Sequence, residues 1–160
     1  MRNYTFRPLT PDDLPLMRRW LKMPHVRVWW GDVERNIALM QQDMDNRAIS
    51  MQVVELTGKP FAYLHHHDVQ AFGMPQFADL AYGTRAINTF IGETEAMGQG
   101  HAAGYISACV VDLRLRYSQV TTAPNSTDAR QISIYSQAGF RRRRLASTRD
   151  GKLVQVMIHN

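Results

Sequence analysis

The spacing of apolar residues changes period several times along the chain, and each change predicts a boundary between elements. Residues 4–9 alternate between apolar and polar side chains, which predicts a strand that a proline ends. Residues 11–22 show helical spacing, with Thr10 as the N-cap and Pro11 at the first helical position. Residues 33–46 show a second helical pattern. The chain is therefore predicted to open with one strand and two helices.

Most of the later apolar runs have the period of strands. A Thr-Gly-Lys-Pro turn joins two of them into a hairpin, and an Arg-Asp-Gly-Lys turn joins the last two. The strands expected in this part of the chain span residues 49–56, 61–69, 83–92, 117–122, 140–147 and 153–158.

Two further helices are expected in the second half of the chain. One spans residues 102–115, and the other begins at a cap on Ser126 or Thr127 and ends at Gly139. Strands and helices in this order are typical of an α/β (α+β) protein in which helices cover a sheet.

The connection between the first two helices is unusually aromatic. Pro24 is expected to break the first helix, and residues 25–32 then contain Trp29, Trp30 and Asp32. Two interpretations stay open. Both indoles belong to the core, or one of them lines a pocket for an acceptor substrate to which Asp32 adds negative charge.

Composition limits the class of protein. A chain of 160 residues with 44% apolar and 21% charged residues fits one folded domain, which we expect to span residues 1–160. No apolar run reaches the roughly 18 residues of a membrane span, and the first residues lack the apolar core of a signal peptide. We therefore expect a cytoplasmic protein without a membrane partner. The single Cys109 is interpreted as a small buried apolar residue.

The formal charge of +5 owes much to four consecutive arginines at residues 141–144. Adjacent side chains of a strand face opposite sides, so only two of the four share a face. No nucleic-acid motif accompanies the run, and no nucleic-acid partner is expected. The two last strands offer a free edge that these arginines would blunt, so a monomer and a homodimer remain equally open.

Three consecutive histidines lie in a predicted strand at residues 65–67. Because their side chains alternate between the two faces, the three cannot bind one metal ion together. No metal site is predicted. His65 and His67 share a face, and His65 is a candidate contact of the acceptor.

Small residues cluster at residues 97–104, between the strand at 83–92 and the helix at 102–115. Glycines let the backbone approach a ligand, and the first N–H groups of a helix can bind an anion. The segment matches neither G-x-G-x-x-G nor G-x-x-x-x-G-K-[ST]. It predicts either a site for a phosphate-bearing cofactor or an ordinary turn and cap.

Two motifs and the order of elements resemble the GNAT superfamily of N-acetyltransferases. Gly100 and Ala102 fit the small positions of its acyl-CoA loop R/Q-x-x-G-x-G/A, although Met97 stands at the usual Arg or Gln. Residues 124–140 resemble P-x-x-x-N-x-R-A-I-x-x-Y-x-x-A-G-F, with Asp128 at the usual Asn. The resemblance implies the GNAT fold, a mixed, mostly antiparallel sheet of six to seven strands flanked by about four helices.

Within that superfamily, residues 4–158 resemble the aminoglycoside 6′-N-acetyltransferases, and parts resemble related siderophore-biosynthesis acyltransferases. The similarity lies in Trp-Trp-Gly at residues 29–31, Arg-Ala-Ile-Asn at 85–88 and the loop at 97–100. The strand in the resistance enzymes is approximately R-G-I-D-Q, and its Asp is a proposed general base. Asn88 stands there in this chain, and an amide cannot take a proton at neutral pH.

Other groups must then serve as base, or none is needed. The carboxylates nearby in sequence are Asp79, in the loop-like residues 70–82, together with Asp32, Glu93 and Glu95. Glu93 and Glu95 are also typical of solvated positions before a loop. A chain of water, or a minor population of neutral amine, is the remaining route.

The resemblance implies direct transfer of an acetyl group from acetyl-CoA to a primary amine, without a covalent enzyme intermediate. A backbone N–H near residues 89–91 polarises the thioester carbonyl, and Tyr135 protonates the leaving thiolate. Tyr135 has a second interpretation as a packing residue. The implied catalytic residues are Tyr135, Asn88 and Asp79. The implied acceptor-binding residues are Trp29, Trp30, Asp32, His65 and Asn88. The implied cofactor-binding residues are Phe90, Ile91, Gln99, Gly100, His101, Ala102, Ala103, Gly104, Asp128 and Arg130.

The acceptor is expected to be an aminoglycoside, with antibiotic modification as the result. Aminoglycosides are polycations, whereas this chain is basic, with 14 acidic residues. A second hypothesis is therefore another small amine, such as a polyamine-like compound or a siderophore precursor. A third is an acyl-CoA-binding protein without turnover.

Overall fold

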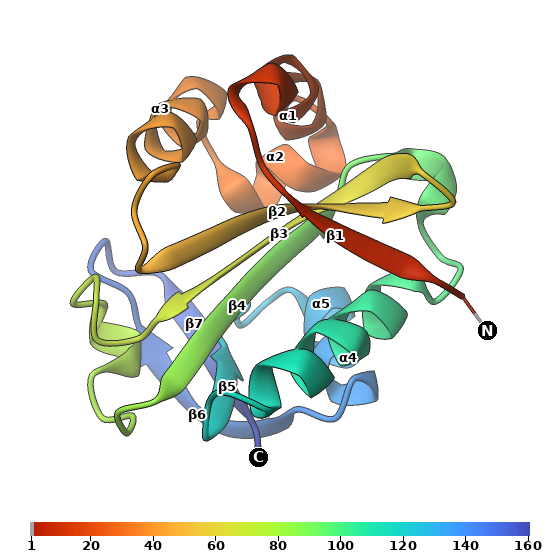
Figure 1. Cartoon of the computed structure of the whole chain (residues 1–160). Coiled ribbons are helices and arrows are strands. Elements are labelled where there is room, and N and C mark those ends of the chain that lie inside the picture. Colours follow the sequence, from red (N-terminus) through yellow and green to blue (C-terminus); the bar gives the residue numbers. More distant parts are fainter. Residues whose placement is uncertain (1) are drawn as a thin grey trace. The chain divides into compact units, whose positions relative to one another are not determined.

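The computed structural model describes residues 2–160 and joins seven strands in the order β1-β2-β3-β4-β5-β7-β6 (Figure 1). The strands are β1 (Tyr4–Pro8), β2 (Ile49–Leu56), β3 (Lys59–Asp68), β4 (Thr84–Ile91), β5 (Gln119–Thr122), β6 (Arg141–Ser147) and β7 (Leu153–His159). The α-helices are α1 (Leu14–Leu21), α2 (Pro24–Trp30), α3 (Val33–Asp43), α4 (His101–Arg114) and α5 (Ala129–Gln137). The chain also contains three short 3-10 helices within residues 2–160, η1 (Pro11–Asp13), η2 (Pro75–Phe77) and η3 (Thr94–Ala96).

The chain forms two compact units. The first comprises Met1–His65 with Thr89–His101, and the second comprises His66–Asn88 with Ala102–Asn160. Strands β3 and β4 therefore contribute residues to both units. None of the helices within residues 2–160 has the length and apolar character needed to cross a bilayer.

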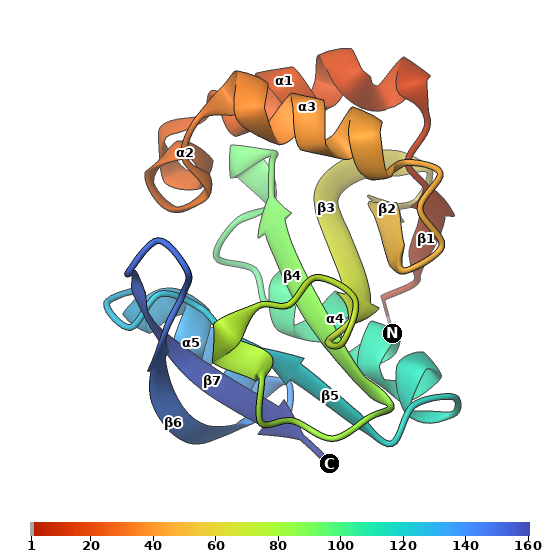
Figure 2. The same cartoon turned by 90° about the vertical axis from the view of Figure 1, so that its left-hand side faces the viewer.

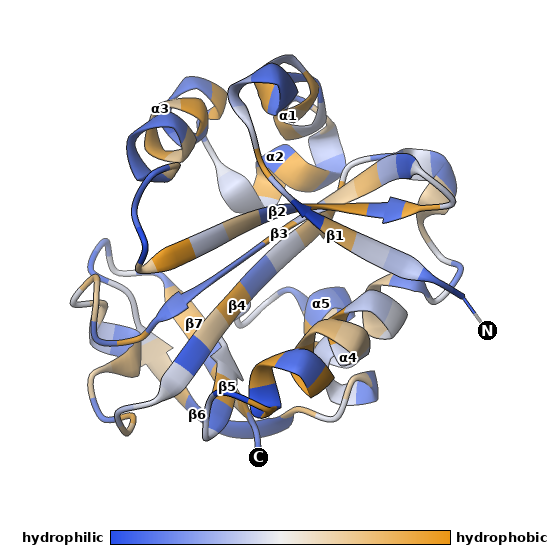
Figure 3. Cartoon of the chain, viewed as in Figure 1, coloured by the Kyte–Doolittle hydropathy of each residue, from blue (hydrophilic) through white to orange (hydrophobic). Residues whose placement is uncertain are grey.

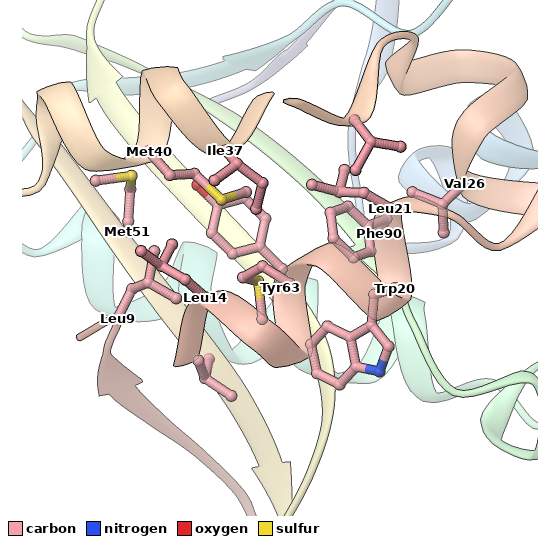
Figure 4. Packing of buried hydrophobic residues seen from close by; sticks show 13 residues of the cluster. Leu9, Leu14, Trp20, Leu21, Val26, Ile37, Met40, Met51, Tyr63 and Phe90 are labelled. Atoms are coloured by element: carbon pink, nitrogen blue, oxygen red, sulfur yellow. The ribbon is translucent and has the colours of Figure 1, made fainter. Parts of the chain in front are cut away.

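In the first unit, β1 pairs antiparallel with β2, and α1 packs beside α3 (Figures 1 and 2). The apolar faces of these helices meet the strands in one buried cluster, which includes Trp20 and Leu21 of α1, Ile37 of α3, Tyr63 and Phe90 (Figure 4). The helical spacing of apolar residues places those of α1 and α3 on one face of each helix. Burial of these side chains away from water supplies the main stabilisation of the folded unit.

In the second unit, β4 runs parallel to β5, while β7 pairs antiparallel with both β5 and β6. Buried side chains of β7, together with Phe77 and Leu80, form the core cluster here. The edge strand β6 is exposed and polar at its arginine-rich start, in contrast to the apolar β7 (Figure 3). Cys109 is buried in α4, as predicted, and burial raises the pKa of its thiol to about 12.

The predicted mixed, mostly antiparallel sheet is confirmed, with five α-helices among residues 2–160 where about four were expected. The additional helix is α2, in the segment that was predicted to be an irregular connection. The first helix ends before Pro24 as predicted, with Leu21 as the last residue of α1, but Pro24 also begins α2, since the missing N–H of proline costs nothing in the first turn. The cap predicted at Ser126 or Thr127 was also wrong. Asp128 caps α5, and its carboxylate accepts the N–H of Gln131 at 3.1 Å.

Candidate active site

Three rings of the first unit surround Trp30 and form an aromatic cluster with it. Its centroid lies 5.0 Å from that of Phe90, 5.7 Å from that of His65 and 5.9 Å from that of Tyr63. The edge-to-face angles are those that aromatic pairs prefer. Trp30 is thus half-buried against other rings, whereas Trp29 is 41% exposed. Trp29 and Trp30, which are adjacent in the sequence, therefore have different surroundings.

His65 is oriented by a hydrogen bond within this cluster. The Tyr63 hydroxyl lies 2.9 Å from His65 Nδ1, and burial raises the pKa of Tyr63 well above its usual value. The phenol therefore remains protonated. This contact holds the half-buried His65 ring beside Trp30.

Asp32 has a structural task. Its exposed carboxylate caps α3 by accepting the N–H of Arg35 at 2.8 Å. Glu93 is engaged as well, because it pairs with Arg19 at 2.6 Å and accepts from the indole of Trp20 at 2.8 Å. The Arg19 guanidinium holds the pKa of Glu93 below its usual value. Glu95 is exposed.

The loop before α4 presents unused backbone donors. Gly98 and Gly100 have φ of +74° and +78°, which glycine adopts without strain. Among the described residues 2–160, the N–H groups of Gly98, Gln99 and Gly100 donate to no other group, and all three residues are exposed. His101, where α4 begins, is buried instead. These donors and the first turn of the helix suit the phosphates of an acyl carrier.

The remaining predicted cofactor contacts fall at the two ends of the loop and on α5. Phe90 is buried and Ile91 is half-buried at the end of β4, and the Ile91 carbonyl lies 2.8 Å from Nε2 of His25. In the first turn of α4, Ala102 is buried while Ala103 and Gly104 are half-buried. On α5, Arg130 is exposed, and burial raises the pKa of the capping Asp128.

Tyr135 is among the least accessible polar groups of the second unit. Its side chain is fully buried, and its hydroxyl makes no direct hydrogen bond of normal geometry with any described residue from 2 to 160. Burial raises the pKa of Tyr135 to about 12, although the side chains of Thr122 and Gln131 favour its ionised form. A buried hydroxyl without a partner costs free energy, and such a group is often completed by a ligand. The proton-donor role of this phenol stays a prediction.

The two other predicted catalytic residues differ in what surrounds them. Asn88 is exposed on β4, although its strand neighbours are buried. Asp79 forms ion pairs with Arg144 at 2.5 Å and Arg143 at 3.5 Å, and the Arg144 guanidinium holds the pKa of Asp79 below its usual value. A carboxylate bound in this way is a poor proton acceptor. Two arginines of β6 thus form ion pairs with Asp79, the candidate general base. No sequence pattern indicates this contact.

The other two histidines of the triplet belong to the core of the second unit. Burial and the neighbouring Arg85 lower the pKa of His66 to about 3, and burial lowers that of His67 to about 4. Arg85 donates to Nδ1 of His66 at 2.8 Å and stacks on Tyr117. Within residues 2–160, no group of three His, Cys, Asp or Glu side chains is arranged to hold a metal ion.

Sequence reasoning missed two residues at the glycine loop. Arg2 and Tyr4 contact it through Gln99 and His101. They lie almost a hundred positions earlier in the chain, and no local pattern connects them with the loop.

Three features are expected of a transferase that takes an acyl group from a phosphate-bearing carrier. They are a mixed sheet, a glycine loop with free backbone donors before a helix, and a buried phenol. The family model described as acetyltransferase (GNAT) domain matches residues 10–148, and the chain belongs to this family. It is an N-acetyltransferase with acetyl-CoA as its cosubstrate.

Similar proteins include several acetyltransferases of small amines. The chain is 26% identical over 164 residues to the aminoglycoside N(6′)-acetyltransferase type 1 of Klebsiella pneumoniae, covering 96% of this chain and 81% of the relative. The solved structure of the aminoglycoside acetyltransferase AAC(6′)-Ib with coenzyme A and kanamycin has a TM-score of 0.84 and 21% identity, covering 99% and 95% of the two chains. Spermidine N-acetyltransferase from Vibrio cholerae, solved with CoA and spermine, has a TM-score of 0.74 and 14% identity, covering 97% and 94%.

Proposed function

We propose that this chain acetylates a primary amine of an aminoglycoside, in the manner of a 6′-N-acetyltransferase. The buried, unpartnered hydroxyl of Tyr135 is the structural observation that most supports a catalytic role over mere binding of acyl-CoA. The relationship to aminoglycoside 6′-N-acetyltransferases over 96% of the chain supports the acceptor class.

The proposed reaction is a single transfer. The lone pair of a neutral amine forms the C–N bond, and the C–S bond of the thioester breaks. The leaving thiolate takes the proton of the Tyr135 hydroxyl, whose raised pKa keeps that proton in place at neutral pH. The amine releases its own extra proton to water, and water returns a proton to the Tyr135 oxygen before the next turnover. A backbone N–H of residues 89–91 polarises the carbonyl.

No protein carboxylate is assigned as the general base. Asn88 cannot accept a proton, and Asp79 is bound by two arginines. Asp32 caps a helix and Glu93 is paired with Arg19. Only the unprotonated fraction of the acceptor amine therefore reacts, and the rate rises with pH as this amine loses its proton.

A second acceptor class follows from the same residues. Neither Asn88 nor the neutralised Asp79 offers a free negative charge to a polycation, which favours an amine of lower charge. Siderophore precursors with a single amine test this class, whereas polyamine-like compounds, which are polycations themselves, test whether charge alone decides the acceptor. Spermine is bound in the structure of the Vibrio cholerae relative, which has the same fold.

Thiol release from acetyl-CoA, with a panel of kanamycin-type aminoglycosides, polyamines and hydroxamate precursors, tests the proposal. Turnover that saturates with an aminoglycoside and yields its 6′-N-acetyl derivative supports the first class. Turnover confined to simpler amines moves the assignment to the second. No release with any amine, despite tight CoA binding, contradicts enzymatic function.

We also propose that residues 1–160 act as one acetyltransferase domain, because the family match crosses both compact units. The proposal holds for a monomer or a homodimer. The supply of acetyl-CoA inside the cell makes the cytoplasm the proposed place of action.

A further inference from the structure

The glycine loop before α4 is held by Arg2, the residue two positions before β1. Arg2 Nη1 donates to the carbonyl oxygen of Gln99 at 2.6 Å and lies 3.3 Å from Nδ1 of His101. An exposed arginine thus contacts Gln99 of the loop and His101, the first residue of α4.

His101 completes this attachment from the interior. The hydroxyl of Tyr4 lies 2.9 Å from the same Nδ1, and the imidazole packs edge-to-face on the Tyr4 ring with centroids 5.8 Å apart. A guanidinium only donates hydrogen bonds, so Nδ1 accepts and the ring is neutral with its proton on Nε2. His101 is buried, so the second contact of Arg2 is with a side chain that is largely shielded from solvent.

The bond to Gln99 determines which way a ligand-binding N–H points. The described chain has no cis peptide bonds, so the carbonyl of Gln99 and the N–H of Gly100 point in opposite directions from one planar unit. Because the carbonyl faces Arg2, the N–H of Gly100 faces away from it. Glycines at positions 98 and 100 would let this peptide rotate if the carbonyl were released.

We propose that Arg2 is a positioning residue for acetyl-CoA, which fixes the Gln99–Gly100 peptide so that the Gly100 N–H is presented to a phosphate oxygen. The proposal rests on the assignment of this loop to acetyl-CoA in the proposed function. Met97 places an apolar side chain at the start of the loop, and the amide of Gln99 is engaged with the carbonyl of Glu95 at 2.6 Å, so the backbone donors are the groups left for a phosphate. Fixing them before the ligand arrives lowers the entropy cost of binding.

The test compares Arg2→Ala with Arg149→Ala, a matched control. Arg149 is also exposed, and its guanidinium donates to the carbonyl of Gly73 at 2.8 Å, in a loop of the second unit. Both variants lose one positive charge and one arginine–carbonyl bond. Calorimetry measures the affinity for CoA and for pantetheine, which lacks the pyrophosphate, and steady-state assays measure kcat and KM for acetyl-CoA.

For Arg2→Ala we expect roughly five- to ten-fold weaker CoA binding and a matching rise of KM, the loss of about one hydrogen bond. We expect kcat, pantetheine affinity and the Arg149→Ala control to stay at wild-type values. Equal CoA affinity in wild type and Arg2→Ala overturns the proposal, as does an equal loss for CoA and pantetheine. A wild type that binds CoA without acetyl transfer contradicts the proposed function alone, and one that does not bind CoA contradicts both.

Discussion

The indole of Trp20 lies directly against the backbone of Gly92, with no space between them for a side chain. A Cβ atom placed on Gly92 would be 2.1 Å from the indole carbons. The same indole donates to Glu93, the next residue. The first helix is therefore attached to the end of β4 by the largest fully buried side chain of the first unit, at the point where the chain turns toward the glycine loop.

We expect Gly92→Ala to lower the free energy of unfolding by about 3 kcal/mol, because an added methyl group overpacks a rigid, fully buried ring. Urea denaturation measures the loss. Trp20→Leu in the same chain makes room for the methyl group, so the double variant should lose less than the sum of the two single changes. Strict additivity would show that the ring does not limit position 92.

Asn88→Asp restores a carboxylate at an exposed position of β4. We expect kcat/KM for a cationic aminoglycoside near pH 7 to rise about ten-fold or more, since a general base removes the need for neutral amine. Asn88→Ala, which adds neither charge nor base, is the control and should not exceed the wild type. An unchanged rate in Asn88→Asp would mean that the side chain at position 88 does not meet the acceptor.

The pH dependence of the wild type follows from the two proton transfers. The rate is expected to rise with pH as the acceptor amine loses its proton. Burial raises the pKa of Tyr135 to about 12, so this acid stays protonated and causes no decline across the range in which the amine titrates. A profile of kcat/KM against pH checks this. A fall with an apparent pKa between 7 and roughly 9 would require a different acid.

Acid is expected to destabilise the fold through His66. Its pKa is lowered from 6.5 to about 3, chiefly by burial, so the unfolded chain binds a proton that the folded chain excludes. Stability is then lost as pH falls from about 6.5 toward 3, at up to about 1.4 kcal/mol per pH unit from this group. Denaturation curves between pH 7 and 4 measure the slope. His66→Gln keeps an acceptor for Arg85 and should reduce the slope, with the remainder due to His67, whose pKa is also lowered. An unchanged slope would assign the effect elsewhere.

Most of the sheet and helices could be predicted because apolar period and turn chemistry are local properties. The extra helix α2 was missed because a proline has opposite meanings in a helix interior and in its first turn. Tyr135 and the loop were found through motifs. The neutralisation of Asp79 by Arg144 and the attachment of the loop to Arg2 join residues distant in sequence, and only folding brings such pairs together.

The central claim is that Tyr135 donates the proton that completes acetyl transfer, and Tyr135→Phe tests it most directly. The variant removes a buried hydroxyl without a partner, so its melting temperature should equal or exceed that of the wild type, which makes lost activity a chemical effect. Acceptor-dependent thiol release from acetyl-CoA is the measurement. We expect kcat to fall roughly 100-fold with CoA affinity unchanged. Full turnover by Tyr135→Phe would contradict the account and leave Tyr135 as a packing residue.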